Sequence, residues 1–224
     1  MGLRRLRTVG LGPGSGYCTA SWAKYWPGLF NASGLGDARF SPLQGPGRPV
    51  PVLYAGRSQT AVLLETVFHD VHVTSDRLIT RLGLAGRNLV EFELPERLVL
   101  YDLRDEALTD LGLERRQLVS TSAAHYACTR EWAEALRARR GIGGAHPVGL
   151  LWCSRVAELA KGDSLLLADL LPGRAEEILV LFGDQLATTD PRHYLASERF
   201  EDLSLRLALP LVASVAEQLG ATLV

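Results

Sequence analysis

The sequence has few cysteines, and those it has are unevenly spaced. Cys18, Cys128 and Cys153 are the three thiols in 224 residues. Three isolated cysteines are too few for the disulfide framework of a small secreted domain or for a zinc site with paired ligands. We therefore expect reduced thiols and no bound metal ion.

A surplus of positive charge is also missing. Lysine and arginine together number 24 against 25 aspartates and glutamates, so the formal net charge is −1. The isoelectric point is near 6.5, and the arginines are dispersed apart from a cluster at 137–140. Because nucleic-acid binding normally needs a basic stripe or a high isoelectric point, direct contact with DNA or RNA is disfavoured.

Long apolar runs are absent as well. Residues 1–7 are cationic, but neither a sustained apolar stretch nor an obvious cleavage site follows them. The most apolar stretch, 203–219, carries Arg206, Pro210 and Glu217. It therefore indicates an amphipathic helix and not a membrane span. We expect no export and no membrane segment, with a cytoplasmic location as the default.

What is present suits one globular domain. The hydrophobic fraction is 47% and the charged fraction 22%, and a chain of this length can build a single core. We find neither repeats nor low-complexity tracts. The predicted domain spans 1–224, with a loop-rich N-terminal segment at about 1–35 and an added C-terminal helix at about 200–220.

The pattern of apolar residues predicts interleaved strands and helices. Strands are predicted at 49–55, 78–82, 88–103 with Pro95 marking a break or an edge position, 148–153 and 178–182. Helices are predicted at 59–69 with Ser58 as N-cap, 105–111, 123–140, and 203–219 with a bend or interruption near Pro210. The first fifty residues are expected to be ordered loops with room for one short strand or helix, 164–171 a short apolar segment, and 188–198 a polar connector. This irregular order favours an α+β fold with a central mixed β-sheet flanked by helices.

Several residues resemble known functional motifs but lack the neighbouring residues or structure that those motifs require. The glycines at 10–16 precede no convincing helix, so they do not form a dinucleotide or phosphate loop. His69 and His72 lie three residues apart but have no evident third metal ligand. Ser154 lacks the glycines of a nucleophile elbow. It remains either a turn cap or a polar contact to a substrate.

An arginine, a tyrosine and a glutamate follow one another along a predicted strand and helix. Arg39 could hold a pyrophosphate, Tyr54 could stack on a flat heterocycle, and the carboxylate of Glu65 could stabilise positive charge at an anomeric carbon. Singly, each has an ordinary explanation, as a loop cation, a core ring and a solvated helix position. Together they suit an anionic substrate with a cleavable sugar bond.

The order of these motifs resembles the RES-domain family, which is named after an arginine, a glutamate and a serine. The resemblance rests on Arg39-Phe-Ser-Pro, Val52-Leu-Tyr54-Ala, Ala61 to Glu65, Gly149 to Arg155, and Leu179 to Asp184. It implies a fold similar to ADP-ribosyltransferases. By position, Arg39 and Glu65 match the family's catalytic residues, while Tyr54 and Ser154 match substrate contacts. The family's upstream Arg-Tyr element has Lys24-Tyr25 as its nearest counterpart, so both residues are expected substrate contacts, although a lysine lacks the planar guanidinium.

The same resemblance implies a function. Members are toxins of bacterial toxin–antitoxin pairs that deplete NAD, and their usual partner is a small helix-turn-helix antitoxin. We therefore expect NAD as substrate, phosphate as a possible co-substrate, no cofactor, and a hetero-oligomer with the antitoxin. Two alternatives stay open, an ADP-ribosyltransferase that modifies a protein and a catalytically silent interaction protein.

Overall fold

An eight-stranded mixed sheet runs through the molecule in the order β1-β8-β9-β10-β5-β2-β7-β11. The computed structural model describes residues 6–25, 30–69, 71, 76–139, 146–154, 177–194, 196–200 and 202–224. Neighbouring strands are antiparallel except β8 and β9, which pair in parallel. The strands are β1 (Thr8–Leu11), β2 (Gly16–Trp22), β5 (Val52–Gly56), β7 (Arg87–Glu93), β8 (Leu98–Asp102), β9 (Gly149–Cys153), β10 (Glu177–Phe182) and β11 (Ala196–Phe200). The expected α+β class with a central mixed sheet is confirmed.

The central strands are buried on both faces. Every residue of β10 is buried, and its side chains alternate between two apolar clusters. Ile178, Val180 and Phe182 belong to one cluster, and the two intervening leucines belong to the other. At Gly149 a side chain would place its Cβ only 2.1 Å from the carbonyl oxygen of Val180. Glycine there lets β9 approach β10 closely.

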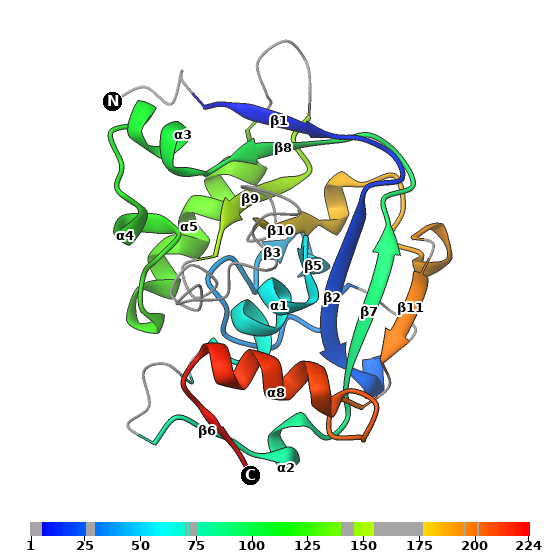
Figure 1. The fold of residues 1–224 in the computed structure, drawn as a ribbon. Helices are drawn as coiled ribbons and strands as arrows, with labels where there is room; N and C mark the ends of the chain where they lie inside the picture. Colours follow the sequence, from blue (N-terminus) through cyan, green and yellow to red (C-terminus); the bar gives the residue numbers. More distant parts are fainter. Residues whose placement is uncertain are drawn as a thin grey trace.

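Helices cover one face of this sheet in two groups (Figure 1). Beside β8 and β9 lie α3 (Asp105–Asp110), α4 (Arg115–Leu118) and α5 (Tyr126–Arg137). The second group is α8 (Leu209–Gln218), whose apolar side chains share a cluster with α1 (Gln59–Val62) and the π-helical turn Leu63–Val67 that follows it. The minor elements are two small sheets, β3 (Gln44–Gly45) with β4 (Arg48–Pro49) and β6 (Leu78–Ile79) with β12 (Thr222–Leu223), the helix α2 (Arg81–Leu84), and short 3₁₀ turns at Ala23–Tyr25, Ala123–His125, Gly183–Gln185 and Pro191–His193. In the described part of the chain, no helix is both long and apolar enough to cross a membrane.

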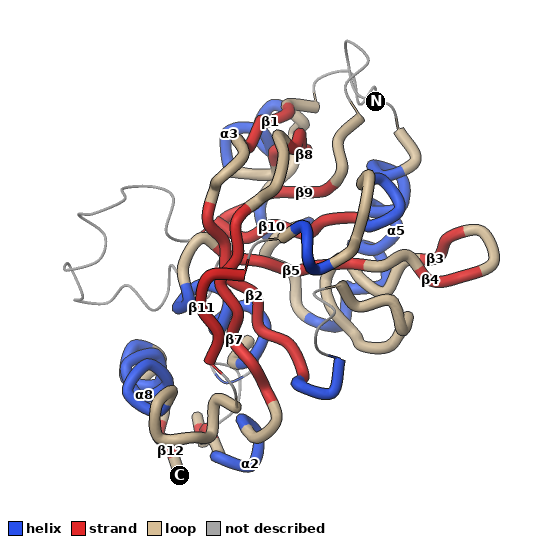
Figure 2. Tube along the Cα trace, turned by 90° about the vertical axis from the view of Figure 1, so that its right-hand side faces the viewer, coloured by secondary structure: helices blue, strands red, loops and turns tan. Residues whose placement is uncertain are grey.

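β2 and β5 part soon after they meet. Within the described residues one registered pair, Cys18 with Gly56, joins them. At Val52 the edge of β5 pairs instead with Asn31, through hydrogen bonds of 2.7 and 3.0 Å. Figure 2 shows β5 running across the molecule while β2 and β7 turn away from it. This divergence opens space between two neighbouring strands.

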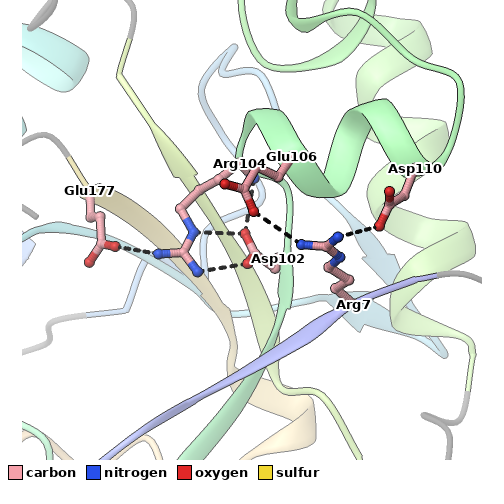
Figure 3. A network of polar contacts seen from close by, with 6 residues as sticks. All are labelled: Arg7, Asp102, Arg104, Glu106, Asp110 and Glu177. Atoms are coloured by element: carbon pink, nitrogen blue, oxygen red, sulfur yellow. Dashed lines mark hydrogen bonds and ion pairs between the residues drawn. The ribbon is translucent and has the colours of Figure 1, made fainter. Parts of the chain in front are cut away.

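A polar network connects strands in the half of the sheet that contains β1 (Figure 3). Arg104 donates hydrogen bonds to Asp102 and Glu177, so it joins the end of β8 to the start of β10. Burial alone would raise the pKa of Asp102, but the hydrogen bonds and charge of Arg104 outweigh it and lower that pKa. Beside them Arg7 contacts Glu106 and a second acidic residue of α3. The network therefore ties β1, β8, β10 and α3 together.

Several elements differ from the predictions. Both β1 and β2 lie within the segment predicted to be loop-rich. β2 forms a strand there because seven of its residues pair with β7 in an antiparallel register. The predicted connector at 188–198 ends in β11, which pairs with the other edge of β7. Leu78 to Leu82 is a two-residue strand followed by the start of α2. The segment 164–171 lies outside the described residues.

Helix boundaries were also predicted imperfectly. The C-terminal helix begins at Leu209 and not at Leu203, and Pro210 lies in its first turn, where a missing N–H is harmless. Near that proline the sequence predicts a bend or an interruption, and the structure has the start of the helix there, preceded by turns at 203–208. Ser58 does cap α1, since its side chain accepts a hydrogen bond from the N–H of Ala61 at 3.0 Å.

Candidate active site

A pocket of about 260 Å³ occupies the space between β2 and β5. It is lined by strand residues, by the loop that leads to β3, and by the helical turn after β5. Three of the predicted site residues, Arg39, Tyr54 and Glu65, line it together. These residues come from a loop, a strand and a helical turn, so the fold brings together what the sequence only places in order.

Glu65 lies on the π-helical turn, where the N–H of Phe68 donates to the carbonyl of Leu63 at 2.8 Å. Such wide turns are frequent at functional sites, because they displace side chains from the positions of a regular helix. The side chain of Glu65 is 8% exposed. Its Oε2 accepts a hydrogen bond from Ser154 Oγ at 2.6 Å. Ser154 thus holds one oxygen of the carboxylate, and Glu65 lines the pocket.

Ser154 follows the end of β9 and is fully buried. It is not among the pocket-lining residues, and it reaches the site through Glu65. The sequence analysis assigns Ser154 a direct substrate contact, which stays a prediction. The geometry gives it a positioning role, because its hydroxyl orients the carboxylate.

Arg39 is held by residues far away in the sequence. Its Nη1 donates to Thr121 Oγ1 at 2.8 Å and to the Thr121 carbonyl at 3.0 Å. The guanidinium lies over the ring of Tyr126, 5.4 Å from its centroid. The carbonyl of Arg39 accepts a hydrogen bond from Thr129. Thr121 and the first turn of α5 therefore fix both the side chain and the backbone of this arginine.

One edge of the Arg39 guanidinium makes no hydrogen bond to the described residues. Its Nη2 lies 3.9 Å from Glu65 Oε1, which is an ion-pair distance but too long for a hydrogen bond. Its Nε is buried and finds no hydrogen-bond partner among the described residues. Nε and Nη2 form the edge that matches a bidentate anion. The arginine is anchored by Nη1 and keeps that edge largely uncommitted.

Tyr54 both lines the pocket and supports the Arg39 loop. Its hydroxyl oxygen accepts a hydrogen bond from the N–H of Phe40 at 2.8 Å. Its ring meets the edge of Trp152 at a centroid distance of 6.1 Å. Burial raises the pKa of Tyr54, so the phenol stays protonated at physiological pH.

Lys24, from the counterpart of the family's upstream element, is not among the described residues that line this pocket. Lys24 is exposed and its Nζ lies 5.6 Å from the ring centroid of Trp22. The side chain of Tyr25 lies outside the described residues. A substrate contact by either residue stays a prediction.

Some lining residues were missed or considered for another role. His69 lines the pocket, although sequence reasoning considered it only with His72, which lies outside the described residues. Within the described ranges, no group of three histidine, cysteine or acidic residues is placed to hold a metal. Thr121 and Tyr126 carried no motif, and they approach Arg39 only through the tertiary fold.

The chain is similar to a known protein family and to a solved structure. The sequence profile of a family described as RES domain matches residues 13–189, which is more than half of the chain. Among curated proteins, none matches the chain. A solved structure described as the MbcT–MbcA toxin–antitoxin complex of M. tuberculosis is similar, with 17% identity, a TM-score of 0.55, and 93% of each chain covered. At that identity the likeness speaks to the fold.

Proposed function

The chain belongs to the RES-domain family, and on this premise we propose that it cleaves the bond between nicotinamide and ribose in NAD. The observation that carries the proposal is the convergence of Arg39, Tyr54 and Glu65 on one pocket, with Ser154 fixing the glutamate. An anion contact, an aromatic ring and a carboxylate are what this reaction needs.

Glu65 stabilises the transition state. As nicotinamide departs, positive charge develops at the anomeric carbon, and a nearby carboxylate strengthens its hold as that charge grows. Ser154 occupies Oε2, so Oε1 is the oxygen left to bind the ribose hydroxyls. Nicotinamide leaves as a neutral heterocycle, and the site therefore needs no strong general acid.

Arg39 binds the pyrophosphate through its Nε and Nη2 edge. Thr121 already occupies Nη1, which fixes the direction of the remaining edge. Desolvated, charge-assisted hydrogen bonds of this kind are among the stronger ones in proteins. Tyr54 packs against the nicotinamide end, since its ring belongs to the pocket lining. The acceptor of the ADP-ribosyl group is water, phosphate or a protein side chain.

Mass spectrometry of NAD incubated with the purified protein tests the reaction. We expect free nicotinamide, with ADP-ribose as the other product if water is the acceptor. In added phosphate, ADP-ribose 1″-phosphate would indicate phosphorolysis. A mass shift on an added protein would support ADP-ribosyl transfer instead, and intact NAD under all conditions would leave a silent interaction protein.

We further propose that the protein is the toxin of a toxin–antitoxin pair. The support is the family and the similarity to a toxin that was solved with its antitoxin. A small helix-turn-helix antitoxin would silence it by covering the pocket, and DNA recognition would fall to that partner, because this chain has a net charge of −1. Expression of the chain alone should halt growth and lower cellular NAD, and co-expression of the partner should restore both. Harmless expression with unchanged NAD would contradict the proposal.

A further inference from the structure

Two exposed apolar side chains stand at the rim of the pocket. Trp22 is 39% exposed and Leu35 is 68% exposed, and both belong to the pocket lining. Tryptophan is highly buried on average, so a solvent-exposed indole in the lining of a pocket calls for an explanation. The two side chains come from different segments, the end of β2 and the loop before Arg39.

Trp22 is exposed but held in place. It lies opposite Arg87 in the register of β2 and β7, and the Arg87 guanidinium lies 4.2 Å from the ring centroid. Arg87 is itself fixed by a hydrogen bond from Nε to the carbonyl of Gly83 at 3.1 Å. A cation over an indole face is an attractive contact. The ring orientation is thus set before any ligand arrives.

The backbone of Leu35 is also held by hydrogen bonds. Its carbonyl accepts a hydrogen bond from the side-chain amide of Asn31 at 3.0 Å, and its N–H donates to Ser33 Oγ at 3.1 Å. Asn31 in turn pairs with β5 at Val52. The leucine side chain is therefore the exposed end of a loop that the sheet edge anchors.

The size of the pocket indicates a role for Trp22 and Leu35 at its rim. A volume of about 260 Å³ falls below the roughly 300–1,000 Å³ of pockets that enclose a whole drug-sized ligand. A dinucleotide held by its nicotinamide end near Glu65 must extend outward across the rim. A flat aromatic base is the part of such a ligand that stacks on an indole and packs against a leucine.

We propose that Trp22 and Leu35 form the binding site for the purine base of the dinucleotide. The assignment rests on the proposed function, because it places the second heterocycle of the same substrate. Trp22 is the stacking platform and Leu35 the apolar contact beside it. The pair determines affinity for the dinucleotide and has no part in the bond-breaking step.

Calorimetry with AMP tests the site without any turnover. AMP should bind the wild-type protein, and ribose 5-phosphate, which lacks the base, should bind much more weakly. Trp22→Ala should weaken AMP binding by roughly 5- to 100-fold, the range that one base–aromatic stack is worth. Trp22→Phe should restore part of that loss, and it serves if the alanine variant does not fold.

A matched pair of leucines controls for the loss of exposed apolar surface. Leu35→Ala should weaken AMP binding, whereas Leu82→Ala, at an 86% exposed leucine outside the pocket lining, should not. Equal AMP affinity in the wild type, Trp22→Ala and Leu35→Ala would overturn the assignment, and so would a failure of AMP to bind the wild type.

A kinetic arm separates this inference from the proposed function. Trp22→Ala should raise the KM for NAD about tenfold and leave cleavage of nicotinamide mononucleotide, which has no purine, unchanged. If the wild type cleaves NAD and the variant does so with an unchanged KM, this inference alone fails. If the wild type binds AMP with the expected dependence on Trp22 but cleaves no NAD, the proposed reaction fails and the base site stands.

Discussion

Replacing Glu65 with glutamine removes one charge and almost no volume. Glutamine keeps an oxygen that can accept the hydrogen bond that Ser154 now donates to Oε2 at 2.6 Å. The substitution leaves the apolar packing of the π-helical turn against α8 in place. We therefore expect a folded protein with a thermal midpoint close to that of the wild type.

The expected rate loss follows from the charge that is removed. A unit charge about 4 Å from a carboxylate interacts by about 4 kcal/mol at an effective dielectric constant of about 20. Since each 1.36 kcal/mol is about tenfold in rate, full loss would cost roughly 1,000-fold. The anomeric carbon carries only part of a unit charge in the transition state, so we expect kcat to fall by about 100- to 1,000-fold.

Nicotinamide release at saturating NAD is the assay, and Glu177→Gln is the matched control. Glu177 is also a buried carboxylate paired with an arginine, but it lies outside the pocket at the start of β10. Its glutamine variant should lose stability and keep kcat. A Glu65→Gln enzyme that releases nicotinamide within a few-fold of the wild-type rate would refute the role given to the carboxylate.

Three further substitutions test the surrounding contacts. Arg39→Lys should weaken NAD binding by about tenfold or more in calorimetry, because lysine lacks the guanidinium edge; unchanged affinity would make Arg39 a loop contact. Ser154→Ala should lower kcat about tenfold with KM unchanged, whereas a raised KM with unchanged kcat would indicate direct substrate contact. Asp102→Asn should destabilise the protein by about 1–3 kcal/mol at pH 7 in denaturant unfolding. Because the folded-state pKa of Asp102 is lowered, its contribution is present above about pH 3.9 and is lost as the pH falls through the folded-state pKa, so the deficit should shrink there. A deficit independent of pH would count against the ion pair.

The strands that the sequence predicted well are those whose burial shows in their composition. β9 and β10 are continuous apolar runs, and such runs in a short segment indicate strands buried on both faces. β2 was missed because small and polar residues interrupt it, and its stability comes from seven paired positions on β7. That pairing joins residues about seventy positions apart, which local patterns do not report.

Part of the candidate site could likewise be predicted from the sequence, and part could not. Arg39, Tyr54 and Glu65 lie close together in the sequence, so their order could be recognised, and the structure does bring them to one pocket. Their supports could not be foreseen. Thr121 reaches Arg39 from 82 residues away and Ser154 reaches Glu65 from 89 residues away. Whether a side chain orients a carboxylate depends on the distance between their atoms, and that distance is known only in the folded chain.

The divergence of β2 from β5 sets the positions of the two proposed heterocycle contacts, Tyr54 and Trp22. Tyr54 stands on the strand that continues the central sheet, and Trp22 stands at the end of the strand that leaves it. Asn31 takes the edge that β2 vacates, and through its amide it also fixes Leu35. The span between the two heterocycle contacts is therefore set by backbone hydrogen bonds of the sheet and not by a flexible loop. A contact held on rigid elements loses little conformational entropy on binding, so a dinucleotide should gain more affinity from its second base here than from a mobile lid.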